Sequence, residues 1–183
     1  QNGYQNAFWT GAQMILGDGY GFANADDIVA HELTHGVTQY ESNLFYFYQS
    51  GAINESLSDV FGEYYDQNNG LGTDNTTTKW LLGEDTLGLG AVRSMSNPPA
   101  YSDPDKMTST LYVKTPGDGG GVHSNSGVNN KAVFLMVDGG AFNGKTVTGI
   151  GWDKTAAIYY EVQTNLLTSG SDYSDLYYAL QQA

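Results

Sequence analysis

Cysteine is absent from this sequence of 183 residues, which excludes disulfide bonds and thiolate metal sites. Cationic residues are scarce: 7 Lys and Arg stand against 20 Asp and Glu, giving a formal net charge of −13. Such a charge disfavours binding to nucleic acid, which depends on cationic contacts to phosphate, and binding to anionic membranes. No apolar run approaches the roughly 18 residues that a membrane-spanning helix needs. We therefore expect neither nucleic acid nor a membrane as a partner.

The remaining composition is that of a globular protein. Apolar residues make up 40% and aromatic residues 13% of the chain, enough for a hydrophobic core in one domain over residues 1–183. The many carboxylates favour solubility and leave oxygen ligands for a cation such as calcium. A cysteine-free, acidic chain rich in Tyr, Gly and Asn fits a secreted, extracellular protein of bacterial origin.

Hydrophobic periodicity predicts a mainly α fold with a small β element at the N-terminus. Residues 8–16 predict a short hairpin or edge strand. Apolar residues recur at helical spacing over 26–40 and 51–65, whereas the polar stretch 68–78 has no periodicity. Further helices are expected over 129–137, 154–167 and 174–182. Four segments result: a short β element (1–25), two helices carrying a metal-binding motif (26–66), a loop-rich segment (67–121) and helices (122–183).

The motif HELTH, from His31 to His35, is the most informative stretch of the sequence. Residues four apart on a helix lie one turn above each other, so the imidazoles of His31 and His35 can reach one metal ion. Glu32 follows the first histidine and lies beside the metal, where a base for metal-bound water is needed. The pattern predicts a catalytic zinc site.

A third ligand is expected from the next helix. Glu55 lies 20 positions after His35, a separation that lets the chain turn and present a carboxylate from a neighbouring helix. Two histidines and one glutamate leave a fourth position open for water, as in catalytic zinc sites. Asp59, one turn beyond Glu55, is placed to accept a hydrogen bond from a ligand histidine and fix its tautomer.

HELTH followed by GAINESLSD resembles the thermolysin family of neutral zinc metalloendopeptidases, and NAFW, RSMSNP and GGGVHSNSGVNNKA extend the resemblance. It spans nearly the whole chain and implies the zinc-helix region and the helical domain of that family. It also implies an endopeptidase that hydrolyses internal bonds of proteins and peptides with metal-activated water. His123 would stabilise the tetrahedral intermediate, Asp118 would orient His123, and Tyr46 would donate to the oxyanion.

The same resemblance assigns substrate-binding residues. Arg93 in RSMSNP would hydrogen-bond the substrate backbone on the primed side. Asn6 and Ala7 in NAFW resemble the edge strand that holds a substrate in extended form. An apolar pocket after the cut bond implies a preference for cleavage before a bulky hydrophobic residue, and its lining would be Ile28, Leu82 and Val92.

Two departures from the family pattern concern the groove and calcium. Family members carry a β-rich N-terminal half that forms one wall of the cleft, and this sequence matches them from near the end of that half and stops short of the last helix. We therefore expect a truncated form of the family fold. Lys79 and Leu81 replace two expected acids of the family's two-calcium cluster. One structural calcium is expected, held by Asp27, Glu63, Asp66 and the carbonyl of Leu81.

Two alternatives to a zinc endopeptidase follow from these departures and from the motif. The chain could be a zinc-binding fragment without activity, because a propeptide or the β-rich region that completes the groove is absent from it. It could also be an aminopeptidase with the same zinc motif, although no separate acidic motif for a substrate's free amine is evident. Internal cuts would indicate an endopeptidase, and stepwise loss of N-terminal residues an aminopeptidase.

Overall fold

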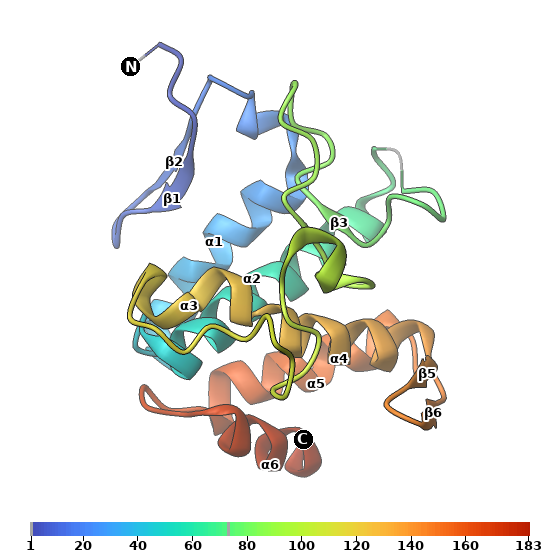
Figure 1. The fold of residues 1–183 in the computed structure, drawn as a ribbon. Helices are drawn as coiled ribbons and strands as arrows, with labels where there is room; N and C mark the ends of the chain where they lie inside the picture. Colours follow the sequence, from blue (N-terminus) through green and yellow to red (C-terminus); the bar gives the residue numbers. More distant parts are fainter. Residues whose placement is uncertain (1, 73) are drawn as a thin grey trace.

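A computed structural model describes residues 2–72 and 74–183 and shows a mainly α-helical protein (Figure 1). This confirms the predicted fold class. Thr73, in the loop predicted over 68–78, lies outside the described residues. The helices are α1 (Asp26–Tyr40), α2 (Tyr48–Asn69), α3 (Asp118–Asn125), α4 (Gly127–Asp138), α5 (Trp152–Glu161) and α6 (Tyr173–Gln182), with short helical turns η1 (Phe22–Asn24), η2 (Pro98–Tyr101) and η3 (Val162–Leu166).

The strands form three two-stranded antiparallel sheets. The predicted N-terminal hairpin is present, with Ala7 paired to Leu16 and Trp9 to Met14. Two further hairpins have strands too short to show a period-2 pattern, and the sequence did not indicate them. The strand pairs are β1 (Ala7–Trp9) with β2 (Met14–Leu16), β3 (Leu81–Leu82) with β4 (Arg93–Ser94), and β5 (Gly140–Phe142) with β6 (Lys145–Val147).

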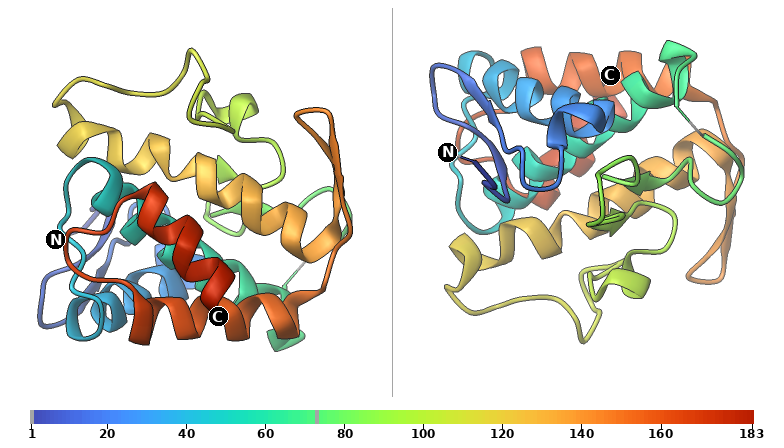
Figure 2. Two further views of the ribbon diagram at one scale, coloured as in Figure 1. Left: turned by 90° about the horizontal axis from the view of Figure 1, so that it is seen from below. Right: turned by 90° about the horizontal axis from the view of Figure 1, so that it is seen from above.

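Helix α2 lies at the centre of the molecule, and α1, α4, α5 and α6 pack around it (Figure 2). Most of its residues are buried, and Ile53, Leu57 and Val60 belong to the main hydrophobic core, which also takes side chains from α4, η3 and α6. The start of α1 lies beside the end of α2, since Asn69 hydrogen-bonds Asp26. The two helices therefore run antiparallel.

The helix boundaries differ from the predictions mainly where glycine or tyrosine has left-handed backbone angles. Helix α2 begins at Tyr48, three residues earlier than predicted, with a φ of 47° at that residue. Helix α3 begins inside a tract that was predicted to be loop up to Gly121. Gly119, Gly120 and Gly121 have φ of 60°, 94° and 75°, and only the residues after them form a regular helical turn.

Among the described helices, none combines the length and apolarity that crossing a membrane requires.

Candidate metal centre and active site

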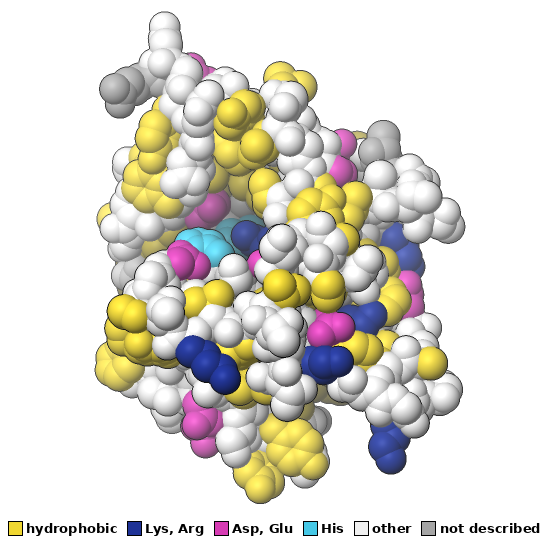
Figure 3. Space-filling model, viewed as in Figure 1, with side chains coloured by type: hydrophobic (Ala, Val, Ile, Leu, Met, Phe, Trp, Pro, Cys, Tyr) yellow, Lys and Arg dark blue, Asp and Glu magenta, His cyan; other side chains and the backbone are white. Residues whose placement is uncertain are grey.

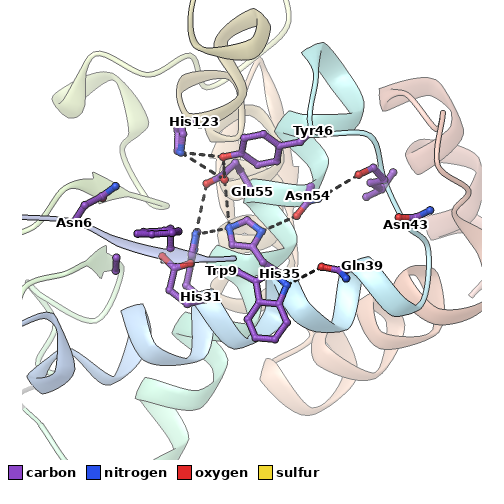
Figure 4. Close-up of a pocket in the computed structure, with 14 residues that line it drawn as sticks. Asn6, Trp9, His31, His35, Gln39, Asn43, Tyr46, Asn54, Glu55 and His123 are labelled. Carbon is purple, nitrogen blue, oxygen red and sulfur yellow. Dashed lines mark hydrogen bonds and ion pairs between the residues drawn. The ribbon is translucent and has the colours of Figure 1, made fainter. Parts of the chain in front are cut away.

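The three expected zinc ligands lie together between α1 and α2 (Figure 4). His31 and His35 project from one face of α1, and their Nε2 atoms are 3.1 Å apart. Glu55, on the first half of α2, places its carboxylate oxygens 3.6 Å from Nε2 of His31 and 3.3 Å from Nε2 of His35. All three residues are almost inaccessible to solvent except for the edge of His35.

The hydrogen bonds behind the imidazoles fix their tautomers. Nδ1 of His31 lies 2.8 Å from Oδ1 of Asp59, as the sequence predicted. Nδ1 of His35 lies 2.8 Å from Oδ1 of Asn54 and 3.2 Å from Oγ of Ser58. Because a carboxylate and an amide oxygen only accept, each Nδ1 carries a proton, and Nε2 of each ring is the atom left to bind a metal ion.

Asn54 and Ser58 were not assigned from the sequence, although a signal for them was present. They lie four apart on α2, each directly before an assigned residue, Glu55 and Asp59. Residues four apart share one helix face, so α2 turns two adjacent stripes toward α1. Glu55 and Asp59 lie on one stripe. Asn54 and Ser58 lie on the other, and both hydrogen-bond Nδ1 of His35.

This arrangement fits a divalent cation. Nε2 of His31 and Nε2 of His35 lie 3.1 Å apart beside the Glu55 carboxylate, and a bound cation would take the place of any proton held between these atoms. Oε2 of the buried Glu55 has no hydrogen-bond partner among the described residues and faces the same point. Nitrogen from two histidines and oxygen from one carboxylate is a donor set that zinc accepts in catalytic sites. His31, His35 and Glu55 therefore fit the expected zinc.

The charges of the centre also favour a cation. Burial lowers the pKa of His35, but the hydrogen bond and negative charge of Glu55 outweigh it and raise the pKa to about 8. Burial raises the pKa of Glu55, yet the hydrogen bond from His35 and the charges of the histidines hold it well below its ordinary value. Glu55 is thus an ionised carboxylate in a buried place, which needs a positive partner.

Asp59 connects the metal centre with Arg93. Asp59 is fully buried and accepts hydrogen bonds from Nε and Nη2 of Arg93, at 2.9 and 2.6 Å, and from Asn130 at 2.8 Å. Burial raises the pKa of Asp59, but the Arg93 charge and the hydrogen bond from His31 hold it below its ordinary value. Nη1 of Arg93 makes no hydrogen bond to the described residues, so its two N–H groups are left for another acceptor.

Tyr46 and His123 form a second group beside Glu55. The Tyr46 hydroxyl donates to Oε1 of Glu55 and lies 3.1 Å from Nε2 of His123. Burial and the Glu55 charge raise the pKa of Tyr46, so its hydroxyl keeps its proton. Nδ1 of His123 lies 2.7 Å from Oδ1 of Asp118, whose other oxygen accepts from the His123 backbone at 3.1 Å. The structure thus brings together all three residues that the resemblance assigned here.

The glycines before His123 let its segment approach the one that carries Tyr46. A Cβ on Gly119 would lie 3.4 Å from the carbonyl oxygen of Tyr46, and a Cβ on Gly120 would lie 2.6 Å from Cγ of Tyr48. Positive φ at both positions adds a second reason for glycine. His123 lies on the short helical turn that follows the glycines.

A cavity of about 450 Å³ opens over the metal centre, where the surface in Figure 3 is hollowed around the histidines. Asn6 and Ala7, which the resemblance assigned to substrate binding, and Glu32, expected as the catalytic base, line it. Trp9 and Gln39, which the sequence analysis did not single out, line it further along α1, and the Trp9 indole donates to Oε1 of Gln39 at 2.8 Å. The remaining lining residues are Phe8, His31, His35, Asn43, Leu44, Tyr46, Asn54, Glu55 and His123.

The three residues expected to line an apolar pocket, Ile28, Leu82 and Val92, do not line this cavity. They lie near the N-terminal end of α1. Val92 donates its N–H to the Leu82 carbonyl at 2.7 Å, and a Cβ on Gly83 would touch both Val92 and Ile28, at 3.6 and 3.7 Å. The three expected residues are therefore brought together. Leu82 has no exposed surface, and only its neighbours can contact a ligand directly.

A second group of acids lies where α1 begins and α2 ends. Two sets of carboxylates have oxygen atoms within 4.8 Å of one another, and Asp66 belongs to both. Asp66 and the fully buried Glu63 each have an oxygen without a hydrogen-bond partner among the described residues. We call this group the acidic cluster; the two sets are Asp26, Asp66 and Asp85, and Asp66, Asp74 and Glu84.

The acidic cluster differs in part from the expected calcium ligands. Asp66 and Glu63 belong to it or adjoin it, whereas the Asp27 carboxylate already accepts from the backbone N–H groups of Ile28 and Gly83. The structure adds Asp26, Asp74 and Asp85, which are distant in sequence and carry no recognisable spacing.

No Lys, Arg or His among the described residues forms an ion pair with the acidic cluster. Burial and neighbouring carboxylates raise the pKa of Asp66 to about 10, and burial and the Asp27 charge raise the pKa of Glu84 to about 8. Lys79, the nearest cation in the sequence, pairs with Asp138 at 2.7 Å instead. Crowded carboxylates without a cationic partner among the described residues can hold a hard cation such as calcium.

Two family models match the chain. One, described as the alpha-helical domain of the thermolysin metallopeptidase, matches residues 42–183, and the other, described as its catalytic domain, matches residues 1–39. The candidate ligands come from both matches: His31 and His35 from the first 39 residues and Glu55 from the remainder.

Individual relatives agree with these models. The chain is 47% identical to a zinc metalloproteinase of Renibacterium salmoninarum over 100% of its length, and 47% identical to a thermolysin of Alicyclobacillus acidocaldarius over 99%. It spans 34% of the length of each of these relatives. Its fold is similar to that of the precursor of protealysin, a metalloproteinase from Serratia proteamaculans, with a TM-score of 0.77 and 37% identity over 100% of this chain and 61% of that one.

Proposed function

The chain belongs to the thermolysin family of metallopeptidases, and we propose on that premise that it is a zinc-dependent endopeptidase that cuts internal peptide bonds. The observation that carries the proposal is the pair of Nε2 atoms 3.1 Å apart beside the Glu55 oxygen that has no hydrogen-bond partner among the described residues, with Glu32 on the same cavity wall. His31, His35 and Glu55 would hold the zinc. A bound zinc ion lowers the pKa of a coordinated water and polarises a carbonyl group.

Glu32 and the Tyr46–His123 pair would carry the proton transfers and the charge stabilisation. Glu32 accepts the proton of the water that attacks the scissile carbonyl and passes it to the departing nitrogen. Tyr46 keeps its proton and can donate it to the oxygen that becomes negative. Nε2 of His123 lies on the same side of Glu55 as the Tyr46 hydroxyl and can also donate to this oxygen, while Asp118 holds the ring in place through Nδ1.

The substrate we propose is an extended segment of a protein or peptide. Among the strands that the structure describes, β1 pairs with β2 alone, so its other edge, at Asn6 and Ala7, is available for backbone hydrogen bonds. The free N–H groups of Arg93 suit a substrate carbonyl. Ile28 and Val92, backed by Leu82, support a preference for a bulky hydrophobic residue after the cut bond.

The proposal is tested by hydrolysis of an internally quenched peptide with Leu after the cut. Wild-type protein loaded with zinc should turn it over, and turnover should be lost in Glu32→Gln and after chelation. Binding of one zinc per chain without turnover would instead support the alternative of a zinc-binding fragment without activity. Stepwise removal of N-terminal residues from an unblocked peptide would indicate an aminopeptidase.

We also propose that the acidic cluster binds one structural calcium ion. Asp66, shared by both sets of carboxylates, would be the central ligand, and Asp74 and Glu84 bring oxygens from the loop-rich segment. Calcium takes six to eight oxygen ligands, which the cluster can supply with nearby carbonyls. Secretion remains our proposal for localisation, because calcium is plentiful outside cells and a cysteine-free chain needs another source of stability.

A further inference from the structure

Asp59 is the end of a series of buried hydrogen bonds that reaches the metal centre from the core. Its Oδ2 atom accepts from Nδ2 of Asn130 at 2.8 Å. Oδ1 of Asn130 accepts from the Ser56 hydroxyl at 2.6 Å, and Oγ of Ser56 accepts from Nδ2 of Asn129 at 2.9 Å. The Tyr159 hydroxyl donates to Oδ1 of Asn129 at 2.8 Å. We call Asn130, Ser56, Asn129 and Tyr159 the buried network.

The buried network joins three helices. Ser56 lies on α2 with Asp59, Asn129 and Asn130 are neighbours on α4, and Tyr159 lies on α5 and belongs to the main hydrophobic core. All four side chains are at most 3% exposed. Buried polar groups need partners within the protein, and these four supply them to one another.

The charge of Asp59 fixes the direction of these hydrogen bonds. A carboxylate only accepts, so Asn130 turns its amide nitrogen toward Asp59 and its oxygen toward Ser56. The Ser56 hydroxyl therefore gives its one proton to Asn130 and accepts from Asn129. Burial raises the pKa of Tyr159, so its hydroxyl keeps the proton that it donates at the far end. Every donor points toward the carboxylate, and hydrogen bonds aligned in this way strengthen one another.

Asp59 passes this restraint on to the metal centre. Its Oδ1 atom lies 2.8 Å from Nδ1 of His31 and accepts from Nη2 of Arg93 at 2.6 Å. His31 and Arg93 both face the cleft, whereas Asn130 approaches Asp59 from the core. No member of the buried network lines the cavity over the metal centre, so the network can act on that centre only through Asp59.

Packing alone does not explain the polar character of the buried network. Replacing both partners of a buried hydrogen bond by apolar groups of the same shape can be nearly neutral for stability. An apolar contact between α2, α4 and α5 would therefore serve the core equally well. It would not hold the carboxylate behind His31 in one orientation.

We propose that the buried network positions Asp59, and through it His31, so that the ligands are held in the geometry that zinc binding requires. The inference rests on the proposed zinc site. Its members are positioning residues, because none of them contacts the candidate ligands or the cavity. Partners behind a ligand histidine affect metal affinity by orienting the ring, and the buried network extends this effect to α5.

A competition titration of zinc against a chromogenic chelator tests the proposal. Ser56→Ala removes one hydroxyl and little volume, and it should raise the dissociation constant of zinc about 2- to 10-fold, the value of one hydrogen bond. Tyr159→Phe keeps the ring and should give a smaller rise. If the network acts as a unit, Tyr159→Phe should have little further effect in a chain that already carries Ser56→Ala.

Thr155→Val is the matched control. Thr155 lies on α5 one turn before Tyr159, is fully buried, and donates its hydroxyl to the Gly151 carbonyl at 2.8 Å. Its loss removes a buried hydrogen bond from the same helix without touching the buried network. Thermal unfolding of the zinc-free variants should show a lower melting temperature for Thr155→Val, while its zinc affinity stays within about twofold of the wild type.

Three outcomes would overturn this inference alone. The first is a wild-type chain that binds zinc and keeps its affinity in Ser56→Ala while only the melting temperature falls. The second is an equal loss of affinity in Thr155→Val, and the third is additive losses from Ser56→Ala and Tyr159→Phe. A wild-type chain that binds no zinc would overturn both this inference and the proposed endopeptidase function. A loss of affinity in Ser56→Ala supports the positioning role even where the quenched peptide is not turned over.

Discussion

The acidic cluster makes the stability of the calcium-free protein depend on pH in an unusual direction. Asp66 is only 2% exposed, and its pKa is raised from the ordinary 3.8 to about 10 by burial and by the carboxylates of Asp74 and Asp26. The folded chain therefore keeps a proton on Asp66 that the unfolded chain has released above about pH 4. Because the unfolded state binds fewer protons, stability falls as pH rises through this window.

The magnitude follows from one proton that Asp66 shares with the carboxylates beside it. Each proton held only by the folded state changes the free energy of unfolding by about 1.4 kcal/mol per pH unit. Between about pH 5 and pH 7, this one proton accounts for a loss of about 2.7 kcal/mol. For a chain of this length, that loss lowers the melting temperature by roughly 5–11 °C. Glu63 and Glu84, whose pKa values are also raised above the ordinary range, act in the same direction.

Thermal unfolding followed by circular dichroism tests this with zinc present, so that His35 is not free to titrate. A calcium-selective chelator should give a melting temperature that falls with pH, and excess calcium should remove the fall, since the cation binds ionised carboxylates. At one hundred times its dissociation constant, calcium adds about 2.7 kcal/mol. Asp74→Asn should weaken both effects. A calcium-free melting temperature that stays level or rises over this window would refute the reasoning.

Two further predictions concern the metal centre. His123→Ala should lower kcat by about 10²–10³ with KM little changed, because His123 is proposed to act on the developing charge; an equal rise in KM would argue for substrate binding instead. Asp59→Asn should weaken zinc affinity by about 10–100-fold in a competition titration, because the amide replaces the carboxylate behind His31; unchanged affinity would contradict that role.

The metal centre could be predicted from sequence because its residues follow helical periodicity. The spacing of four between His31 and His35 survives folding unchanged, and so does the spacing between Glu55 and Asp59. Glu55 could be predicted as the third ligand because only one turn between two helices separates it from His35. The role of His123 could be predicted only from the resemblance, because His123 comes 68 positions after Glu55 and no periodicity connects the two.

The acidic cluster could be predicted only in part, for a physical reason. Its members come from the start of α1, the end of α2 and two places in the loop-rich segment, so their proximity depends on how the loop folds back. Acids in such a segment look like an ordinary solvated surface. Asp27 illustrates the difficulty: it neighbours Asp26 in sequence, but its carboxylate is taken up by backbone N–H groups.

The two candidate metal sites lie at different places along the same antiparallel helix pair, and this links them physically. The acidic cluster connects the start of α1 with the end of α2, through Asp26 and Asp66. One turn or more further along α1, His31 and His35 meet the first half of α2 at Glu55. Helices α1 and α2 would be joined at both candidate metal sites, so neither helix could slide or rotate relative to the other. Each site would therefore restrain the geometry of the other. Repulsion between unpaired carboxylates at one end would push the helices apart and loosen the contacts at the zinc ligands. A cation in the acidic cluster would therefore act on catalysis through the alignment of α1 and α2, without contacting the substrate.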